Sequence, residues 1–154
     1  MKNKALRMVS MLAVFVIAIS AAAGCSAEQE TESTTRTITD MANRTVEIPT
    51  AVDMVLSTAP PTTNIIYLLA PEKLGGWNFQ PSAAEAKYMS SDYANLPVVG
   101  GWFGKQTGNY ETFMAADPDI VFEGFTTTGD TTSADERQQY LGSIPVVAVK
   151  DTAY

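Results

Sequence analysis

The sequence predicts an α/β protein in which a parallel sheet is flanked by helices and preceded by a short β-hairpin. From Val52 onward, short apolar runs rich in Val, Ile and Leu alternate with segments of helical periodicity. The apolar runs are continuous rather than alternating, which is typical of parallel strands buried on both faces. Prolines and capping residues separate the two kinds of segment, as expected for successive strand–helix units.

The first 24 residues are predicted to be an export signal. Lys2, Lys4 and Arg7 form a basic head, and an apolar run follows from Met8 to Ile19. Three alanines and a glycine then precede Cys25, the only cysteine of the chain. This ending resembles a lipobox, which implies cleavage before Cys25 and attachment of lipid to its sulfur. An uncleaved N-terminal anchor and a chance cysteine beside an ordinary signal stay open, and all three alternatives predict export.

Composition restricts the function of the exported part. Three of the 10 basic residues and none of the 17 acidic residues precede Cys25, which leaves 7 against 17 and a net charge of −10. Such a surface repels phosphate backbones, so no nucleic-acid partner is expected, and membrane contact is expected only through the anchor. The chain has no histidine, which excludes Ser–His and Cys–His catalysis and removes the commonest transition-metal ligand.

A flexible linker and a hairpin are predicted ahead of the sheet. Residues 25–35 are rich in Glu, Thr and Ser without apolar periodicity, which is typical of a solvated spacer. The folded domain is expected over residues 36–154. Within it, Thr37–Asp40 and Thr45–Ile48 alternate polar and apolar residues, which predicts a β-hairpin that Pro49 closes.

Strands and helices are then predicted in alternation. The predicted strands are Val52–Leu56, Lys73–Trp77, Leu96–Val99, Asp119–Phe122 and Pro145–Val149. The predicted helices are Pro60–Leu69, Ser82–Met89, Tyr110–Ala116 and Ser133–Leu141. Two prolines open the first helix and Pro71 ends it, while Asp117-Pro118 ends the third. Ser133, with Glu136 three residues later, matches a capping box for the fourth.

The loops after the strands are the predicted binding site. Right-handed crossovers place the carboxyl ends of all strands at one sheet edge, where open α/β sheets bind ligands. Both tryptophans fall in these loops, each directly after a Gly-Gly pair, and an indole ring offers a broad stacking surface. The alternative is that the two rings cover the ends of the core. The candidate ligand-binding residues are Ser57, Thr58, Trp77, Asn78, Phe79, Trp102, Phe103, Glu123 and Phe125.

Two groups of segments carry a family resemblance. The first is Thr37–Pro49, with its Asp-x-x-Asn-Arg pattern, followed by the strand Val52–Ser57. The second contains Pro97–Gly101, Asn109–Glu111 and Ala116–Val121 in the same order. Together they resemble the opening and central segments of periplasmic binding proteins of the iron-siderophore and vitamin B12 uptake family. The resemblance runs from about Arg36 to Val149.

The resemblance implies a substrate-binding lipoprotein that captures its ligand outside the membrane and delivers it to the permease and ATPase complex of an ABC importer. Members of the family have two α/β lobes joined by a long helix, with the ligand between the lobes. The chain would be the N-terminal lobe, since it stops at Tyr154 before a second lobe. Whether it is a fragment, a truncated gene or a deliberately cut sequence stays open.

A ferric siderophore is the first choice of ligand, with a corrinoid second and haem third. In such chelates the metal is already coordinated, so aromatic walls suffice, and no further cofactor or resident metal is expected. Family members hold anionic siderophores with arginines, whereas the candidate loops contain Lys105 as their only cation. Direct binding of Fe(III) through tyrosine and carboxylate oxygens stays an alternative. Glu72, Glu85 and Glu111 are conceivable contacts with the transporter, although ordinary solvated surface charge is the favoured explanation for each.

Two other classes of function were weighed against binding. Glu123 and Asp130 flank one loop and would offer paired carboxylates for acid–base chemistry. Solvated carboxylates are the simpler explanation in a Thr- and Gly-rich loop, so no enzymatic activity is expected. A structural or adhesive surface lipoprotein is the remaining alternative, supported by the Thr-rich linker.

Overall fold

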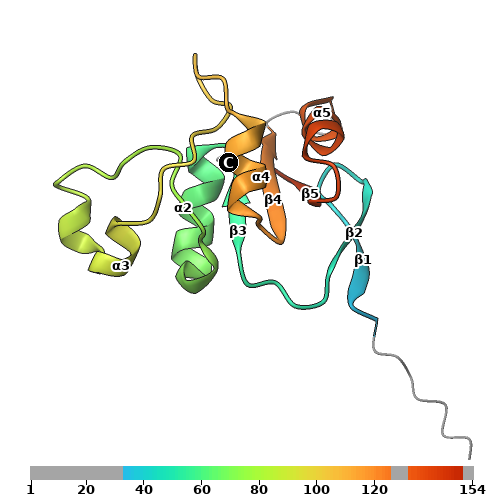
Figure 1. Cartoon of the computed structure of the whole chain (residues 1–154), viewed down its shortest axis with the longest axis horizontal. Coiled ribbons are helices and arrows are strands. Elements are labelled where there is room, and N and C mark those ends of the chain that lie inside the picture. Colours follow the sequence, from blue (N-terminus) through green and yellow to red (C-terminus); the bar gives the residue numbers. More distant parts are fainter. Residues whose placement is uncertain (1–32, 126–131, 151–154) are drawn as a thin grey trace, which may run out of the picture. The chain divides into compact units, whose positions relative to one another are not determined.

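The described part of the chain contains helices and two sheets, which are an antiparallel hairpin and a three-stranded parallel sheet (Figure 1). The structure is a computed structural model that describes residues 33–125 and 132–150. The predicted export signal, Cys25 and most of the predicted linker lie outside these residues, as do residues 126–131 and 151–154.

The predicted hairpin is present. Strand β1 (Thr35–Thr39) pairs antiparallel with β2 (Thr45–Pro49), and β1 begins one residue before the expected start of the domain at Arg36. Val46 and Ile48 alternate with exposed neighbours and are buried, so one face of the hairpin packs onto the parallel sheet.

The parallel sheet consists of β3 (Val55–Ser57), β4 (Ile120–Phe125) and β5 (Val146–Lys150), with β4 in the middle. Both pairings are parallel, and Leu56 lies opposite Val121. The carboxyl ends of the three strands therefore meet at one edge, as predicted.

Two predicted strands are much shorter than expected. Lys73–Trp77 forms one isolated parallel bridge with β3, and Leu96–Val99 forms one with Lys73–Trp77 in turn. The bridges are Val55 with Leu74 and Trp77 with Val98. Gly75 and Gly76 lie between the bridged residues, and glycine weakens a strand because it has no side chain to pack.

Three helices follow the predicted bounds closely. They are α2 (Pro60–Leu69), α4 (Tyr110–Ala116) and α5 (Thr132–Leu141). The short helix α3 (Ser91–Ala94) was not predicted. The side chain of Asn109 caps α4 by accepting a hydrogen bond from the Glu111 amide at 2.8 Å. Asp117 ends α4 in the left-handed conformation, with φ of 50°. Short 3₁₀ turns occur at Pro71–Lys73 and Ala86–Tyr88.

The predicted helix over Ser82–Met89 is wrong. Ser82 and Glu85 cap each other's amides at 2.8 and 3.3 Å, but only the 3₁₀ turn follows them. From Ser82 to Ser90, no side chain is buried, and Tyr88 is almost fully exposed. A segment of this length without an apolar face against the core does not sustain an α-helix.

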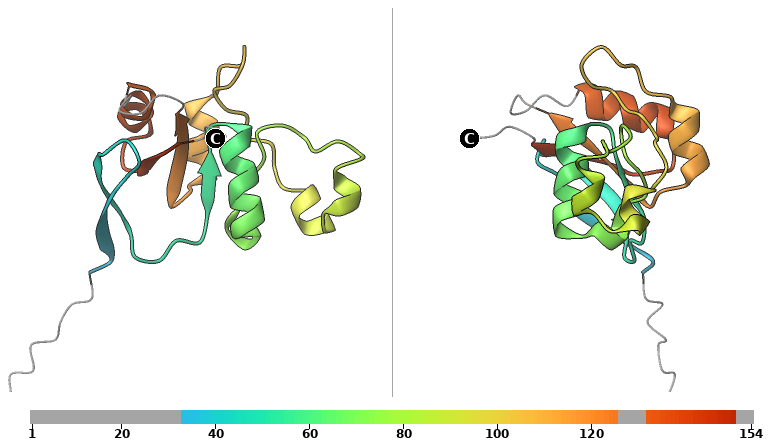
Figure 2. Two further views of the ribbon diagram at one scale, coloured as in Figure 1. Left: turned by 180° about the vertical axis from the view of Figure 1, so that it is seen from behind. Right: turned by 90° about the vertical axis from the view of Figure 1, so that its left-hand side faces the viewer.

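Helices cover both faces of the parallel sheet, as predicted, and α2 and α4 lie on opposite sides of the strands (Figure 2). Alternate strand residues form the two faces. One face packs with α4 and α5 around Leu56, Phe113, Val121, Ala134, Leu141 and Val146. The other packs with α2 and the hairpin through Val46, Ile48, Val55, Ile66, Ile120 and Val147.

The turn between β1 and β2 closes the outer edge of β5. Asp40, whose side chain is fully buried, accepts four hydrogen bonds of 2.8 to 3.1 Å, three of them from the backbone amides of Ala42, Arg44 and Ala148. The fourth comes from Nε of Arg44, which also donates to the Val146 carbonyl at 2.6 Å through Nη2. We call Asp40 and Arg44 the turn pair. This geometry explains the Asp-x-x-Asn-Arg pattern. Asn43 adopts the left-handed conformation of the turn, with φ of 60°, and Asp40 connects the turn to β5 by its hydrogen bond from the Ala148 amide.

The candidate ligand-binding edge

The loops at the carboxyl ends of the strands are held together by backbone contacts. The Thr58 amide donates to the Phe122 carbonyl at 3.0 Å, and the Trp102 amide donates to the Thr58 carbonyl at 2.8 Å. Ser57 and Thr58 are almost completely buried. The loops after β3 and after Val99 therefore contact each other, and the first of them also bonds to β4.

Asn78 joins three of these segments. Its side chain is buried, and Nδ2 donates to the carbonyls of Ser57 at 2.8 Å and Gly100 at 2.7 Å. Its Oδ1 accepts a hydrogen bond of 2.5 Å from the hydroxyl of Thr63 on α2. Asn78 therefore braces the loops, a role that the sequence did not predict because both acceptors are distant in the chain.

Gly101 is required by close packing of the backbone. A Cβ at this position would lie 2.1 Å from the Thr58 carbonyl oxygen, far inside van der Waals contact. The neighbouring Gly100 has φ of 74°, a left-handed conformation that favours glycine. This Gly-Gly pair lets two loops of the edge touch.

Trp77 lies in the core. Only 5% of its surface is exposed, it clusters with Val55, Ile66 and Leu74, and its Nε1 donates to the Tyr93 carbonyl at 2.7 Å. For Trp77 the structure thus matches the alternative, in which the ring covers the end of the core.

Trp102 is half-buried, and its ring contacts the protein itself. The guanidinium carbon of Arg137 lies 4.2 Å from the ring centroid, and the rings of Tyr110 and Phe113 lie 4.6 and 5.3 Å away. A Cβ on Gly108 would come within 2.7 Å of three ring atoms, so the backbone there also packs against the indole.

Phe79 and Phe103 are the aromatic candidates that offer surface at this edge. Phe79 is 44% exposed, Phe103 is half-buried, and their ring centroids are 6.5 Å apart. Phe125 is the last residue of β4, but its side chain lies outside the described part of the structure. Ligand contact stays a prediction for every candidate.

Glu123 forms a buried ion pair with Arg137, and we call these two residues the edge pair. They are 5% and 7% exposed, and Arg137 Nε lies 3.7 Å from Glu123 Oε2. Arg137 Nη1 also donates to the Tyr110 hydroxyl at 2.7 Å and lies 3.2 Å from the Glu136 carboxylate. Burial raises the pKa of Glu123, and the positive charge of Arg137 opposes this only in part.

Arg137 was not predicted as a site residue from the sequence, although its position carries a signal. Ala134, Arg137 and Leu141 recur at helical spacing and are the buried residues of α5. An arginine on the apolar stripe of a helix indicates a buried partner. That partner, Glu123, could not be identified without the fold.

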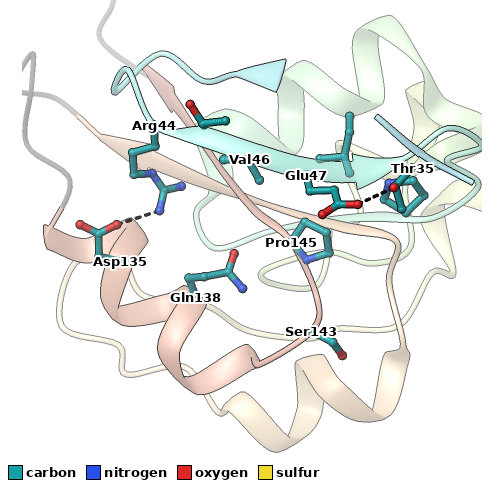
Figure 3. A pocket seen from close by; sticks show the side chains of 11 residues that line it. Thr35, Arg44, Val46, Glu47, Asp135, Gln138, Ser143 and Pro145 are labelled. Atoms are coloured by element: carbon teal, nitrogen blue, oxygen red, sulfur yellow. Dashed lines mark hydrogen bonds and ion pairs between the residues drawn. The ribbon is translucent and has the colours of Figure 1, made fainter. Parts of the chain in front are cut away.

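A separate groove of about 660 Å³ lies between β2 and α5 (Figure 3). Arg44 on the β1–β2 turn and Asp135 on α5 form an ion pair at the groove, with Nη1 of Arg44 3.0 Å from Oδ1 of Asp135. It is lined by Thr35, Arg44, Thr45, Val46, Glu47, Ile48, Pro49, Asp135, Gln138, Ser143 and Pro145. None of the predicted ligand-binding residues is among them.

The described residues contain neither a cluster of metal ligands nor a membrane-spanning helix. No three Asp, Glu, Cys or His side chains gather there as a metal site would require. No helix within residues 33–125 and 132–150 has the length and apolar character needed to cross a membrane.

Comparisons with known proteins give a consistent picture of the fold. No protein-family model matches the sequence, and no curated protein sequence matches it. A solved ABC transporter solute-binding protein from Sulfurospirillum deleyianum is similar, with 28% identity, a TM-score of 0.63, and coverage of 75% of this chain and 36% of that chain.

Two further solved structures share the fold. A periplasmic solute-binding protein from Veillonella parvula is 22% identical with a TM-score of 0.55, and covers 75% of this chain and 35% of its own. The molybdate periplasmic binding protein MolA from Haemophilus influenzae is 22% identical with a TM-score of 0.54, and the match covers 75% of this chain and 34% of that chain. The chain thus spans about a third of the length of these proteins, and it has the fold of a single lobe of an ABC transporter solute-binding protein.

Proposed function

We propose that the protein is the substrate-binding component of an ABC importer, which captures a metal chelate outside the membrane and delivers it to the permease and ATPase. The observation that carries this proposal is the similarity to an ABC transporter solute-binding protein at 28% identity over 75% of the chain. The parallel sheet supports it as well, since its strand ends form a braced edge of the kind that binds ligands in α/β proteins.

The ligand that we propose is a ferric siderophore, with a corrinoid or haem as the next candidates. Phe79 and Phe103 present an apolar aromatic surface at the edge, which suits a bulky chelate. Lys105 in the following loop is exposed and supplies one positive charge for an anionic chelate. Direct binding of Fe(III) by tyrosine and carboxylate oxygens is the alternative within this class.

The proposal includes a location outside the cytoplasmic membrane, with a lipid anchor on Cys25. Its support is the sequence before Cys25, which lies outside the described residues. Expression of the full chain in bacteria tests it directly, by comparing wild type with Cys25→Ser. We expect the variant to disappear from the membrane fraction. Its mass should also lack the increment that an attached lipid adds to the wild type. Equal membrane retention of both would instead indicate an uncleaved helix.

A binding role fits the edge better than acid–base catalysis. Glu123 is buried against Arg137 and is not a solvated acid at the loop surface, while Asp130 lies outside the described residues. Glu72, Glu85 and Glu111 are exposed, and contact of these carboxylates with the permease stays a proposal.

Titration of the full chain in mild detergent tests the binding role. The probes are iron(III) tris-catecholate, cyanocobalamin, haemin and ferric chloride held soluble by a weak chelator, each followed by tryptophan fluorescence. Saturable quenching by the catecholate is expected, and Phe79→Ala and Phe103→Ala should weaken it about tenfold each, since buried aromatic contacts are worth roughly 1–1.5 kcal/mol.

Tyr88→Ala is the matched control, because Tyr88 is an exposed aromatic residue on the 3₁₀ turn at 86–88. It should bind like wild type. Saturable binding of free iron alone would favour direct Fe(III) binding, and no response to any probe would favour the structural or adhesive class.

A further inference from the structure

Arg137 lies at the centre of an aromatic and acidic cluster at the ligand-binding edge. Its guanidinium stacks over Trp102 at 4.2 Å, lies 5.7 Å from the ring centroid of Tyr110 and donates to the Tyr110 hydroxyl at 2.7 Å. Glu123 of β4 is its buried acidic neighbour. One side chain of α5 therefore contacts residues from β4, from α4 and from the loop after Val99.

The edge pair is poorly satisfied for a buried ion pair. At 3.7 Å, Arg137 Nε and Glu123 Oε2 are too far apart for a hydrogen bond, and neither atom has a hydrogen-bond partner among the described residues. The other side chains that face the carboxylate are Thr58 and Ser133, whose hydroxyls favour its charged form, although the geometry of the Thr58 hydroxyl is too poor for a full hydrogen bond. Since a buried pair of this kind gains little stability over apolar residues, its presence calls for another role.

Besides its hydrogen bond to Tyr110, Arg137 contacts the indole of Trp102 face-on. A guanidinium within about 6 Å of an indole centroid is attracted to the ring face, and more strongly when both are shielded from water. The backbone of Trp102 is already fixed by its hydrogen bond to Thr58 and by the close approach of Gly101. The orientation of the ring depends on Tyr110, Phe113 and the backbone at Gly108, and the flat guanidinium supplies a further surface against it.

We propose that Arg137 is a positioning residue of the ligand-binding edge: its guanidinium fixes the indole of Trp102, and Glu123 holds the guanidinium in place. Phe103, which follows Trp102 in the chain, contacts Phe79 at 6.5 Å between ring centroids, and we expect displacement of Trp102 to move this aromatic pair as well. This inference deepens the proposed function, and only its effect on ligand affinity rests on that function.

Fluorescence of Trp102 tests the positioning role without a ligand. In a Trp77→Phe chain Trp102 is the only tryptophan, because the sequence has two. In this full-length background, Arg137→Met should shift the emission to longer wavelength, increase quenching by acrylamide and reduce the near-ultraviolet circular dichroism of the indole. Arg137→Lys keeps the charge but loses the flat surface, so it should restore these signals only in part.

Arg44→Lys is the matched control, because Arg44 is also paired with carboxylates but makes no contact with Trp102. Unchanged emission and quenching in both Arg137 variants would overturn the inference. So would equal changes in Arg44→Lys, since these would reflect general loosening of the fold.

A double-mutant cycle covers the case in which Arg137→Met does not fold. Arg137→Lys and Trp102→Phe are combined, and their effects on the unfolding equilibrium are compared. The two changes should be coupled by roughly fivefold in the equilibrium constant, as expected for a partly buried cation–π contact. Purely additive effects would contradict the proposed contact.

Titration with iron(III) tris-catecholate then separates the inference from the proposed function. If wild type binds and Arg137→Lys binds more weakly, positioning of the ligand-binding edge is supported. Equal affinities would overturn that part of the inference. If wild type does not bind, the proposed function fails, while the fluorescence results still decide whether Arg137 positions Trp102.

Discussion

The turn pair and the edge pair are two arginine–carboxylate contacts that differ in how well they are satisfied. Asp40 accepts four hydrogen bonds, three of them from backbone amides, and Arg44 Nε lies 2.8 Å from it. In the edge pair the corresponding nitrogen–oxygen distance is 3.7 Å, and neither atom of that contact has a hydrogen-bond partner among the described residues. Both pairs hold a buried carboxylate, yet only the first is integrated with the backbone.

The difference shows that burial of an ion pair does not by itself indicate its role. A carboxylate that satisfies backbone amides is needed for the fold, because its loss leaves several donors unpaired. A carboxylate that only faces another side chain can be replaced together with its partner. The turn pair should therefore control stability, and the edge pair should control the local arrangement of aromatic rings.

The largest effect is expected from Asp40→Ala. It removes all four acceptor contacts and leaves Arg44 without its buried partner, so the free energy of unfolding should fall by about 3–5 kcal/mol. Urea denaturation followed by far-ultraviolet circular dichroism measures this. Asp92→Ala is a matched control on the exposed start of α3 and should have little effect. A loss for Asp40→Ala no larger than for Asp92→Ala would contradict the role assigned to the turn pair.

Gly101→Ala tests the loop that adjoins the edge pair. The new methyl group would collide with the Thr58 carbonyl, so the loops must separate, at a cost of about 1–3 kcal/mol. Gly104→Ala is the comparison, because a Cβ there has open space around it and only the positive φ of 60° is unfavourable. Its loss should be about 1 kcal/mol. If the two variants unfold at the same urea concentration, close packing at Gly101 does not limit stability.

Replacing both members of each pair sharpens the comparison. Glu123→Leu with Arg137→Met should change the free energy of unfolding by no more than about 1 kcal/mol, because an apolar pair fills the same space. Asp40→Leu with Arg44→Met should be strongly destabilising, since the amides of Ala42, Arg44 and Ala148 lose their acceptor. Equal losses in the two double variants would remove the distinction between the pairs.

The smallest effect is expected from pH. Burial raises the folded-state pKa of Glu123 above its ordinary value of 4.5. The Thr58 hydroxyl, the charge of Arg137 and the Ser133 hydroxyl oppose the shift, and the charge of Glu136 adds to it. The protonated form is therefore favoured by folding, so the contribution of this group to stability is complete below pH 4.5 and is lost as pH rises through the folded-state pKa. Wild type should lose stability relative to Glu123→Gln between pH 4.5 and neutrality. A difference that is constant with pH would show that Glu123 does not titrate in this range.

The sequence predicted those elements whose causes are local. Pro60–Leu69 and Tyr110–Ala116 match the structure at both ends, because prolines, Asn109 and Asp117 mark their limits. The predicted helix at Ser82–Met89 had suitable residues, but none of its side chains is buried and only Met89 packs against the core. Burial depends on distant parts of the chain, so a local pattern cannot reveal it.

The meeting of the strand ends at one sheet edge was predicted, whereas the contacts of the candidate residues were not. The three strands pair in parallel as expected, but Trp77 lies in the core and Asn78 braces the backbone. The stacking of Arg137 on Trp102 joins residues that only the folded chain brings together. Spacing gives the place of a loop, but long-range packing decides which of its side chains face outward.

The outer edge of β5 has a consequence for association between copies of the protein. A free strand edge presents amides and carbonyls to which another chain can add a strand. On β5, the amide of Val146 bonds to Gln138, the amide of Ala148 to Asp40, and the carbonyls of both to the turn before β2. The turn therefore blocks the addition of a strand from another copy at this edge. The Asp-x-x-Asn-Arg pattern thus opposes aggregation as well as connecting the two sheets.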